Sequence, residues 1–442
     1  MKIPLNFKGK LLISNNRSQF RGKQLFLGAF LLSIGISGVQ AQTADAPNPF
    51  IKTGSVQTAV KGRTLNDFLT LRRDALLQLQ KTPSDQIQPL VLKARTTAEQ
   101  RSGVRRIRIR GHQIISDSDY TFAGYSLGPG SPESTLTVLA SDIADTYISQ
   151  AALRGVPIDS LGVSITSLPD SVKPAKRIVY PHNLLYTIYV KSSATDNQLE
   201  ELRQLTEKYS PSFNLVSNKQ IIKADIDYIQ TPKDLAAVAP YQPGLRDYLK
   251  YKRAAVLWRN DQSKVKKNDK ANPKPKIEKQ PQLDNLHVEV DPATGARRVH
   301  VRYFNLIHDN PAYLAGNDLG PSSQEHQLAT LTSCITHITE IQAASQSIVL
   351  DSLGVSVEGI LDLRAGRPGF ENVPVNLHDI HYTLHIRSPH TLKEIEALRD
   401  SVEAVCPIYN LLISEQKIKG RIVRTNPDKY RLHPQYVYQY KE

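Results

Sequence analysis

The sequence has little of what usually marks a cofactor enzyme. It contains only two cysteines, Cys334 and Cys406, among 442 residues. No phosphate-binding loop and no dinucleotide fingerprint occurs anywhere in it. His308, His326 and His337 do not have the spacing of zinc ligands, which favours hydrogen-bonded or surface roles for them. We therefore expect no cofactor and no bound metal, and look for chemistry at the two cysteines.

Long apolar runs are also scarce, and the single candidate lies near the N-terminus. Residues 1–23 carry six basic residues and no acidic one, and the apolar run 25–38 and the tripeptide Val39-Gln-Ala41 follow. This order is typical of a secretory signal peptide cleaved near Ala41. The alternative is a membrane anchor, but the run is shorter than the roughly 20 residues that a spanning helix needs. No cysteine follows it, which excludes a lipid anchor there. The sequence thus predicts a periplasmic or secreted bacterial protein, without membrane association after cleavage.

The formal net charge of +14 does not by itself indicate an acidic partner. Six of these charges lie in the signal region, and residues 259–281 add eight basic residues against Asp261, Asp269 and Glu278. About +3 remains for the rest of the chain, which is ordinary for a globular protein. Nucleic-acid binding is therefore not expected.

Blocks of the sequence recur in the same order. Residues 102–110 resemble 294–302, residues 127–145 resemble 319–337, residues 159–164 match 351–356, and residues 210–215 resemble 406–411. The segment 65–69 likewise resembles 245–249. The repeat is too long for a solenoid. The sequence predicts two copies of one domain, residues 62–230 and 243–424, with Asp142 standing in the first copy where Cys334 stands in the second, and Ser210 where Cys406 stands.

The residue patterns predict an α+β fold with an antiparallel sheet in each copy. Helices are expected over 64–80 and 197–208, around Asp142, and from Pro211 onward; strands are expected over 104–115, 160–166, 184–191 and 220–229. The second copy should repeat this order. The Lys/Pro-rich segment 260–282 is predicted to be an exposed insert, and residues 425–442 a C-terminal tail.

The two cysteines stand in different local contexts. Gly320, Pro321 and Ser322 end a loop, and the apolar residues of the following helix, which include Cys334, recur at three- or four-residue spacing. Cys334 should therefore be buried. Cys406 directly precedes Pro407, which makes it a candidate N-cap where the helix dipole favours a thiolate.

These features together resemble the OsmC/Ohr family. Those that carry the likeness are Gly-Pro before a helix with Glu325 in its first turn, the Thr-Ser-Cys334 sequence, Asp-Ser-Leu-Gly-Val over 351–355, and Cys406-Pro-Ile-Tyr-Asn. The resemblance implies a two-cysteine thiol peroxidase for organic hydroperoxides, with Cys334 as the peroxidatic and Cys406 as the resolving thiol. It also implies an intertwined dimer, here formed by the two copies as an intrachain pseudo-dimer.

The same resemblance implies a glutamate and an arginine at the site. Glu325 matches the glutamate, although some relatives place it at the position of Gln324. The arginine should come from the first hairpin. Arg298, beside Arg297, is one candidate, and its first-copy equivalent Arg106, beside Arg105, is the other if the copies share the site.

Peroxide reduction requires a thiolate, a proton for the departing oxygen and a second thiol to capture the sulfenic acid. Burial alone would raise the pKa of Cys334, and a nearby arginine would offset this. The physiological dithiol reductant is not identified by the sequence. Two other interpretations remain: a structural disulfide in an exported protein, and a non-enzymatic binding protein for an apolar ligand.

Asp142 raises a separate question, because an ionised carboxylate on a buried helix face costs free energy unless it is paired. One interpretation pairs it with Arg105 or Arg106. The other is that the helix rotates or that water enters.

Overall fold

The computed structural model describes residues 63–424 except 172–173, 175–177, 235–243 and 269–285. All of these lie in one compact unit, residues 47–442. The predicted signal peptide, most of the insert and the tail fall outside the described residues. Within the described residues, no helix has both the length and the apolar character needed to cross a membrane.

The first half of the chain begins with a capped helix and continues through alternating strands and helices. Thr64 caps α1 with a reciprocal hydrogen-bond pair to Asp67, and Gly155 ends α2 in a left-handed conformation. The elements are α1 (Leu65–Lys81), β1 (Leu90–Ala98), β2 (Arg105–Ile109), β3 (His112–Ser116), α2 (Ser131–Arg154), β4 (Ser160–Ser167), β5 (Leu184–Lys191), α3 (Asp196–Tyr209), α4 (Pro211–Ser217) and β6 (Ile222–Gln230).

The second half has the same order of helices and strands. Ser322 caps α6 through a reciprocal pair with Glu325, and Thr391 caps α7 in the same way with Glu394. The elements are α5 (Leu245–Asn268), β7 (Leu286–Val290), β8 (Arg297–Val301), β9 (Phe304–His308), α6 (Ser323–Gln346), β10 (Ser352–Leu361), β11 (His378–Ser388), α7 (Leu392–Glu403), α8 (Pro407–Leu412) and β12 (Ile418–Arg424).

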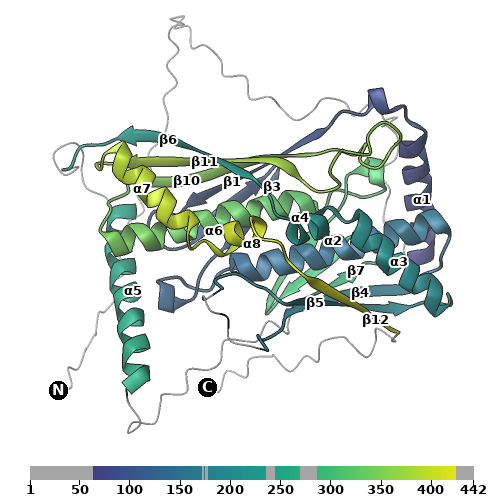
Figure 1. Ribbon diagram of the computed structural model, residues 1–442, viewed down its shortest axis with the longest axis horizontal. Coiled ribbons are helices and arrows are strands. Elements are labelled where there is room, and N and C mark those ends of the chain that lie inside the picture. Colours follow the sequence, from purple (N-terminus) through teal and green to yellow (C-terminus); the bar gives the residue numbers. More distant parts are fainter. Residues whose placement is uncertain (1–62, 172–173, 175–177, 235–243, 269–285, 425–442) are drawn as a thin grey trace, which may run out of the picture. The chain divides into compact units, whose positions relative to one another are not determined.

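Both sheets are built from strands of both halves. One six-stranded sheet has the order β3-β2-β1-β10-β11-β6, and the other has the order β12-β5-β4-β7-β8-β9. In the first sheet, β10 and β11 of the second half lie between β1 and β6 of the first half; in the second sheet the roles are exchanged. Figure 1 shows the two sheets with α2 and α6 between them. The halves therefore share their sheets rather than forming separate domains.

The fold is α+β, but its sheets are not purely antiparallel. β6 pairs with β11 in parallel and β12 pairs with β5 in parallel, while the remaining pairs are antiparallel. The prediction of an antiparallel sheet is corrected in this respect. Each parallel strand is the last of its half and forms an edge of a sheet whose adjacent strand comes from the other half, so no short hairpin dictates its direction.

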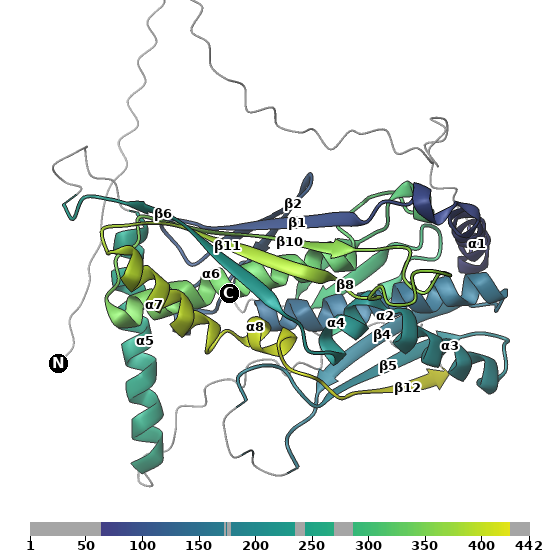
Figure 2. The same cartoon turned by 45° about the horizontal axis from the view of Figure 1, so that its top comes forward.

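The long helices α2 and α6 form the middle layer. They pack on each other, with α6 against β1 and β10 and α2 against β4 and β7 (Figure 2). Hydrogen bonds join them directly, including Thr135 to Thr330 at 2.8 Å and Ser323 to Ser141 at 3.1 Å. Both helices have buried residues on nearly every side, as helices covered by two sheets must. One hydrophobic cluster includes residues of both halves.

The leading helices also contact the opposite half. A Cβ on Gly295 would lie 2.0 Å from the ring of Phe68, and one on Gly103 would lie 2.3 Å from the hydroxyl of Tyr248. Phe68 and Tyr248 occupy matching places in α1 and α5. Each aromatic side chain therefore packs against a glycine, because a residue with a Cβ at that position could not approach the ring so closely.

Three further features differ from the sequence-based expectation. Residues 104–115 were expected to form one strand, but they form β2 and β3, which a turn at Arg110 joins into a hairpin. No strand was predicted over Leu90–Ala98, where Lys93 and Arg95 interrupt the apolar pattern on the exposed face of β1. The insert was expected to begin at Asn260, but α5 continues to Asn268. Residues 260–268 lack glycine and proline, so nothing in them ends the helix.

Candidate functional site

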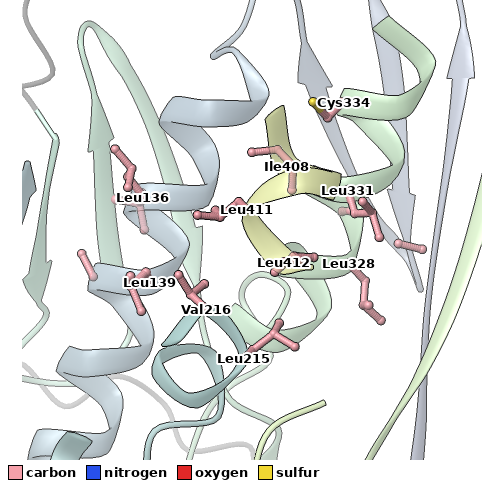
Figure 3. Packing of buried hydrophobic residues seen from close by; sticks show 14 of the residues in the cluster. Leu136, Leu139, Leu215, Val216, Leu328, Leu331, Cys334, Ile408, Leu411 and Leu412 are labelled. Atoms are coloured by element: carbon pink, nitrogen blue, oxygen red, sulfur yellow. The ribbon is translucent and has the colours of Figure 1, made fainter. Parts of the chain in front are cut away.

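The two cysteines lie together in the core of the second half. Cys334 is on α6 and is 2% exposed, while Cys406 caps α8 and is fully buried. Both are free thiols, and the Cys406 thiol interacts with Cys334. Figure 3 shows Cys334 one turn from Leu331 on α6, near Ile408 of the short helix α8. The interaction shows that the two thiols are neighbours, as disulfide formation between them requires.

The environment of Cys406 changes its expected chemistry. Pro407 starts α8, as predicted, and the backbone N–H groups of Ile408 and Tyr409 at this helix start lower the pKa of the Cys406 thiol. Burial and the interaction with Cys334 outweigh these N–H groups, so the pKa of Cys406 is raised well above that of a free thiol. The expectation that the helix start would favour a thiolate here is wrong, since desolvation dominates. Cys406 is therefore suited to remain protonated until the other sulfur is oxidised.

A buried arginine from the first half lies near Cys334. Arg105, on the inner face of β2, is 1% exposed, and its Nε donates to Ser333 Oγ at 3.2 Å. Burial lowers the pKa of Arg105, and the negative charges of Glu340, Asp117 and Cys334 oppose this shift. The Arg105 guanidinium is therefore close enough to interact electrostatically with the Cys334 side chain.

Arg105 belongs to a buried group of charged side chains from β2, α5 and α6, the helix that carries Cys334. Its Nη1 lies 3.1 Å from His337 Nδ1, and Lys252 on α5 pairs with Glu340 on α6 at 2.9 Å, with both of these side chains fully buried. The Tyr248 hydroxyl accepts a hydrogen bond from Lys252 at 3.2 Å. The cluster joins β2 of the first half to α5 and α6 of the second, so it fixes where Arg105 stands relative to Cys334.

Glu325 pairs with an arginine that the sequence analysis did not select. Arg110, in the turn between β2 and β3, contacts Glu325 through Nε at 2.5 Å and Nη2 at 3.0 Å, and it also pairs with Asp318 at 2.8 Å. Its φ of 49° is in the left-handed region, which aims the turn toward α6. Glu325 therefore does pair with an arginine of a hairpin. The hairpin belongs to the other half of the chain, and the arginine is Arg110.

The arginines selected from the sequence lie elsewhere. Arg298 is 63% exposed and pairs with Asp291 at 2.7 Å on the outer face of β8. Arg106 is exposed on β2 and points away from the inner face that Arg105 occupies. The structure does not bring either of them to the cysteines. Strand alternation would have separated the inward Arg105 from the outward Arg106, but only the fold shows that Glu325 pairs with Arg110 at the turn.

The matching positions of the first half form a related arrangement. Arg302, in the turn between β8 and β9, pairs with Glu133 at 3.1 Å, as Arg110 does with Glu325. Asp142 accepts hydrogen bonds from Ser210 Oγ at 2.5 Å and from the backbone N–H of Ser212 at 2.8 Å. The Asp142–Ser210 contact therefore occupies the place that the cysteine pair has in the second half.

Asp142 is buried without a cationic partner, contrary to one of the two expectations. Across the described part of the chain, it forms no ion pair with arginine or lysine, and Gln324 is its third hydrogen-bond donor. Arg105, the expected partner, contacts Ser333 and His337 instead. Burial raises the pKa of Asp142 to about 6, and the bonds from Ser210 and Ser212 act in the opposite direction. Helix rotation or entering water is not needed, since hydrogen bonds satisfy the carboxylate.

A hollow of about 460 Å³ opens on the outer face of the first sheet beside Arg110. Its lining is rich in cationic side chains, and the residues are Lys93, Ala94, Arg95, Arg108, Arg110, Ser356, Val357, Glu358, His381 and Thr383. The Lys93–Glu358 pair, at 3.2 Å, is its exposed ion pair. The hollow therefore favours a polar or anionic group over a purely apolar one.

Comparison with known proteins relates part of the chain to a protein family. Residues 316–420 match the family described as OsmC-like protein, and this range contains Glu325 and both cysteines. No curated protein matches the chain. The chain is similar to a crystal structure of an OsmC-like protein from Mycoplasma pneumoniae, at 21% identity and a TM-score of 0.24, over 30% of this chain and 90% of that one. Residues 316–420 are thus an OsmC-like domain, and the cysteine pair lies inside it.

Proposed function

We propose that the protein is a two-cysteine thiol peroxidase that reduces organic hydroperoxides. The observation that carries this proposal is the pair of buried, interacting free thiols Cys334 and Cys406 inside an OsmC-like domain. Two neighbouring thiols can pass between the dithiol and the disulfide form. A purely structural disulfide would not need the buried cation Arg105 near Cys334.

The proposed reaction has three balanced steps. The Cys334 thiolate attacks the outer peroxide oxygen, the O–O bond breaks, and the alkoxide takes a proton to leave as an alcohol. Cys334 is now a sulfenic acid, and the Cys406 thiol attacks its sulfur, forming a disulfide and releasing water. A dithiol reductant then reduces the disulfide by exchange and is itself oxidised.

The described side chains support each role. Arg105 supplies a positive charge near Cys334, and its hydrogen bond to Ser333, the residue before Cys334, holds it there. The raised pKa of Cys406 keeps the resolving thiol protonated at rest. Arg110, held by Glu325, lies between the cationic hollow and α6. We assign to Arg110 the positioning role that the sequence gave to Arg298 or Arg106.

We also propose that residues 62–230 and 243–424 are tandem copies that form an intrachain pseudo-dimer. Three pairs of reciprocal contacts support this: β1 with β10 and β7 with β4, Arg110 with Glu325 and Arg302 with Glu133, and Tyr248 over Gly103 and Phe68 over Gly295. In each pair the partners exchange halves, as in an isologous interface. Because Asp142 and Ser210 replace the cysteines, only the second copy has peroxidase chemistry.

Export is the remaining part of the proposal. The basic start, the apolar run 25–38 and Ala41 support cleavage by a signal peptidase and function in the periplasm or outside the cell. Mass spectrometry of the mature protein from its native host would show an N-terminus near Gln42. A mature protein that retains Met1 would contradict it.

Turnover of hydroperoxide by the pure protein tests the enzymatic proposal. With dithiothreitol as reductant, the wild-type chain should consume cumene hydroperoxide, while Cys334→Ser should not. Cys406→Ser should accumulate a sulfenic acid on Cys334 that dimedone labels. Ser210→Ala, at the matching position of the first half, is the control and should retain turnover. Normal turnover by Cys334→Ser, or none by a folded and reduced wild type, would overturn the proposal.

A further inference from the structure

A second cluster of reactive side chains lies on the sheet that does not cover the cysteine helix. His287 and Glu289 are on β7 and His300 is on β8, where His287 and His300 are direct cross-strand partners. All three are on the outward face, because Leu286, Val288 and Val290 alternate with them toward the core. In the described part of the chain, this is the one group of three histidine, cysteine or acidic residues whose ligand atoms converge.

The geometry of the cluster is close to that of a metal site. His287 Nε2 lies 3.6 Å from one oxygen of Glu289, and His300 Nε2 lies 3.9 Å from the other oxygen. One ligand atom from each residue lies within 4.8 Å of the other two. A tetrahedral zinc ion with bonds of about 2.1 Å places its ligand atoms about 3.4 Å apart. Small side-chain movements would therefore bring the three atoms into the coordination sphere.

The two imidazoles are adjacent and can reorient. Their rings stack at 4.4 Å with a 10° angle between planes, so capture of an ion would require them to turn about χ2, a soft torsion, until both lone pairs point at it. Nε2 of His300 is buried and has no hydrogen-bond partner among the described residues. A buried nitrogen without a partner costs free energy that coordination to a metal would recover.

Charges around the cluster agree with a cation site. The cluster contains one acidic side chain, Glu289, between two histidines. The neighbouring guanidinium of Arg298 pairs with Asp291 at 2.7 Å. The groups offered to an ion are thus one carboxylate and two imidazoles.

We propose that His287, Glu289 and His300 bind a divalent transition-metal ion, with Zn²⁺ as the best match. Two imidazole nitrogens and one carboxylate are a common zinc ligand set, and solvent would fill the fourth position. The ion would join β7 to β8 on the face away from the thiols, so the site is independent of the peroxidase proposal.

The other sheet provides an internal comparison. The positions of β1 and β2 that match the cluster hold Arg95, Thr97 and Arg108, with Arg95 and Arg108 as direct cross-strand partners. Two arginines cannot coordinate a cation, so the proposed site belongs to one sheet only. Outward histidines elsewhere form simple pairs, as His385 does with Asp227 at 2.8 Å.

Zinc binding by the full chain tests the proposal. The tag-free Cys334→Ser/Cys406→Ser protein removes the thiols as competing ligands, and a chromogenic chelator reports the affinity for Zn²⁺ alone. The parent should bind one ion, and His287→Ala and His300→Ala should each weaken binding at least thirtyfold. His385→Ala is the matched control and should bind as the parent does.

Cobalt gives an independent readout. Co²⁺ bound to the parent should show the strong visible absorption of a four-coordinate site, and Glu289→Gln should reduce or shift it. Circular dichroism of each variant without metal confirms that the fold is retained. Binding that is absent in the folded parent, unchanged in both histidine variants, or lost equally in His385→Ala would overturn the proposal.

Discussion

Replacing Asp142 by asparagine tests how the first half tolerates a carboxylate where the second has a thiol. The carboxylate is 1% exposed and has no cationic partner among the described residues. Its pKa of about 6 in the folded protein compares with about 3.9 for an unfolded aspartate. The folded state therefore holds the proton more tightly, so the contribution of Asp142 to stability is fully present below about pH 4 and is lost as the pH rises toward 6.

The size of this loss follows from the two pKa values. A difference of about two units corresponds to about 3 kcal/mol of unfolding free energy between pH 4 and pH 7. Asparagine is neutral throughout, and its oxygen can accept from Ser210 and Ser212. Its amide would face Gln324, whose own amide can turn to present its oxygen. Asp142→Asn should thus be within about 1 kcal/mol of wild type at pH 4 and more stable by about 2–3 kcal/mol at pH 7.

Urea unfolding of the reduced proteins at pH 4, 5, 6 and 7 measures this difference. Asp145→Asn, one turn further along α2, is the matched control. Arg297 and Arg72 hold the pKa of Asp145 below its usual value despite burial, with contacts of 3.1 and 3.2 Å. Its replacement should destabilise the protein by about 3–5 kcal/mol at pH 7 and by less in acid. If Asp142→Asn loses stability relative to wild type as the pH rises, the reasoning about the first half is wrong.

Two further changes probe the contacts between the halves. Gly295→Ala should lower the free energy of unfolding by about 2–4 kcal/mol in chemical denaturation, because the new Cβ would lie 2.0 Å from Phe68 and the backbone φ is 68°. Gly111→Ala is the control: a Cβ there would have no atom within 4 Å, so the free energy of unfolding should change by less than about 0.5 kcal/mol. Arg110→Ala should reduce kcat/KM for cumene hydroperoxide at least tenfold, while Arg298→Ala, which removes a 63% exposed side chain, should leave it unchanged. Equal effects of the two alanine variants in either comparison would contradict the geometry.

Local physical rules account for what the sequence determined by itself. Helices and strands over both halves follow from side-chain periodicity, from caps such as Thr64 and Ser322, and from Pro407 at the start of α8. The burial of Cys334 follows from the same spacing on one helix. The recurrence of blocks along the chain predicted that the order of elements would recur, as it does. Each of these inferences depends on neighbours within a few residues or on comparison of the chain with itself.

Only the tertiary structure decided the contacts that complete the site. The pairing of Glu325 with Arg110 joins residues far apart in the chain. Arg110 adopts a left-handed backbone conformation in its turn, and an arginine does not mark such a position in a sequence as a glycine would. The parallel edges formed by β6 and β12 depend on which half supplies the adjacent strand. Likewise, the raised pKa of Cys406 reflects burial that α8 acquires only when it packs between α2 and α6. Charge, register and desolvation at this site are properties of groups brought together by folding, so the residue types alone could not fix them.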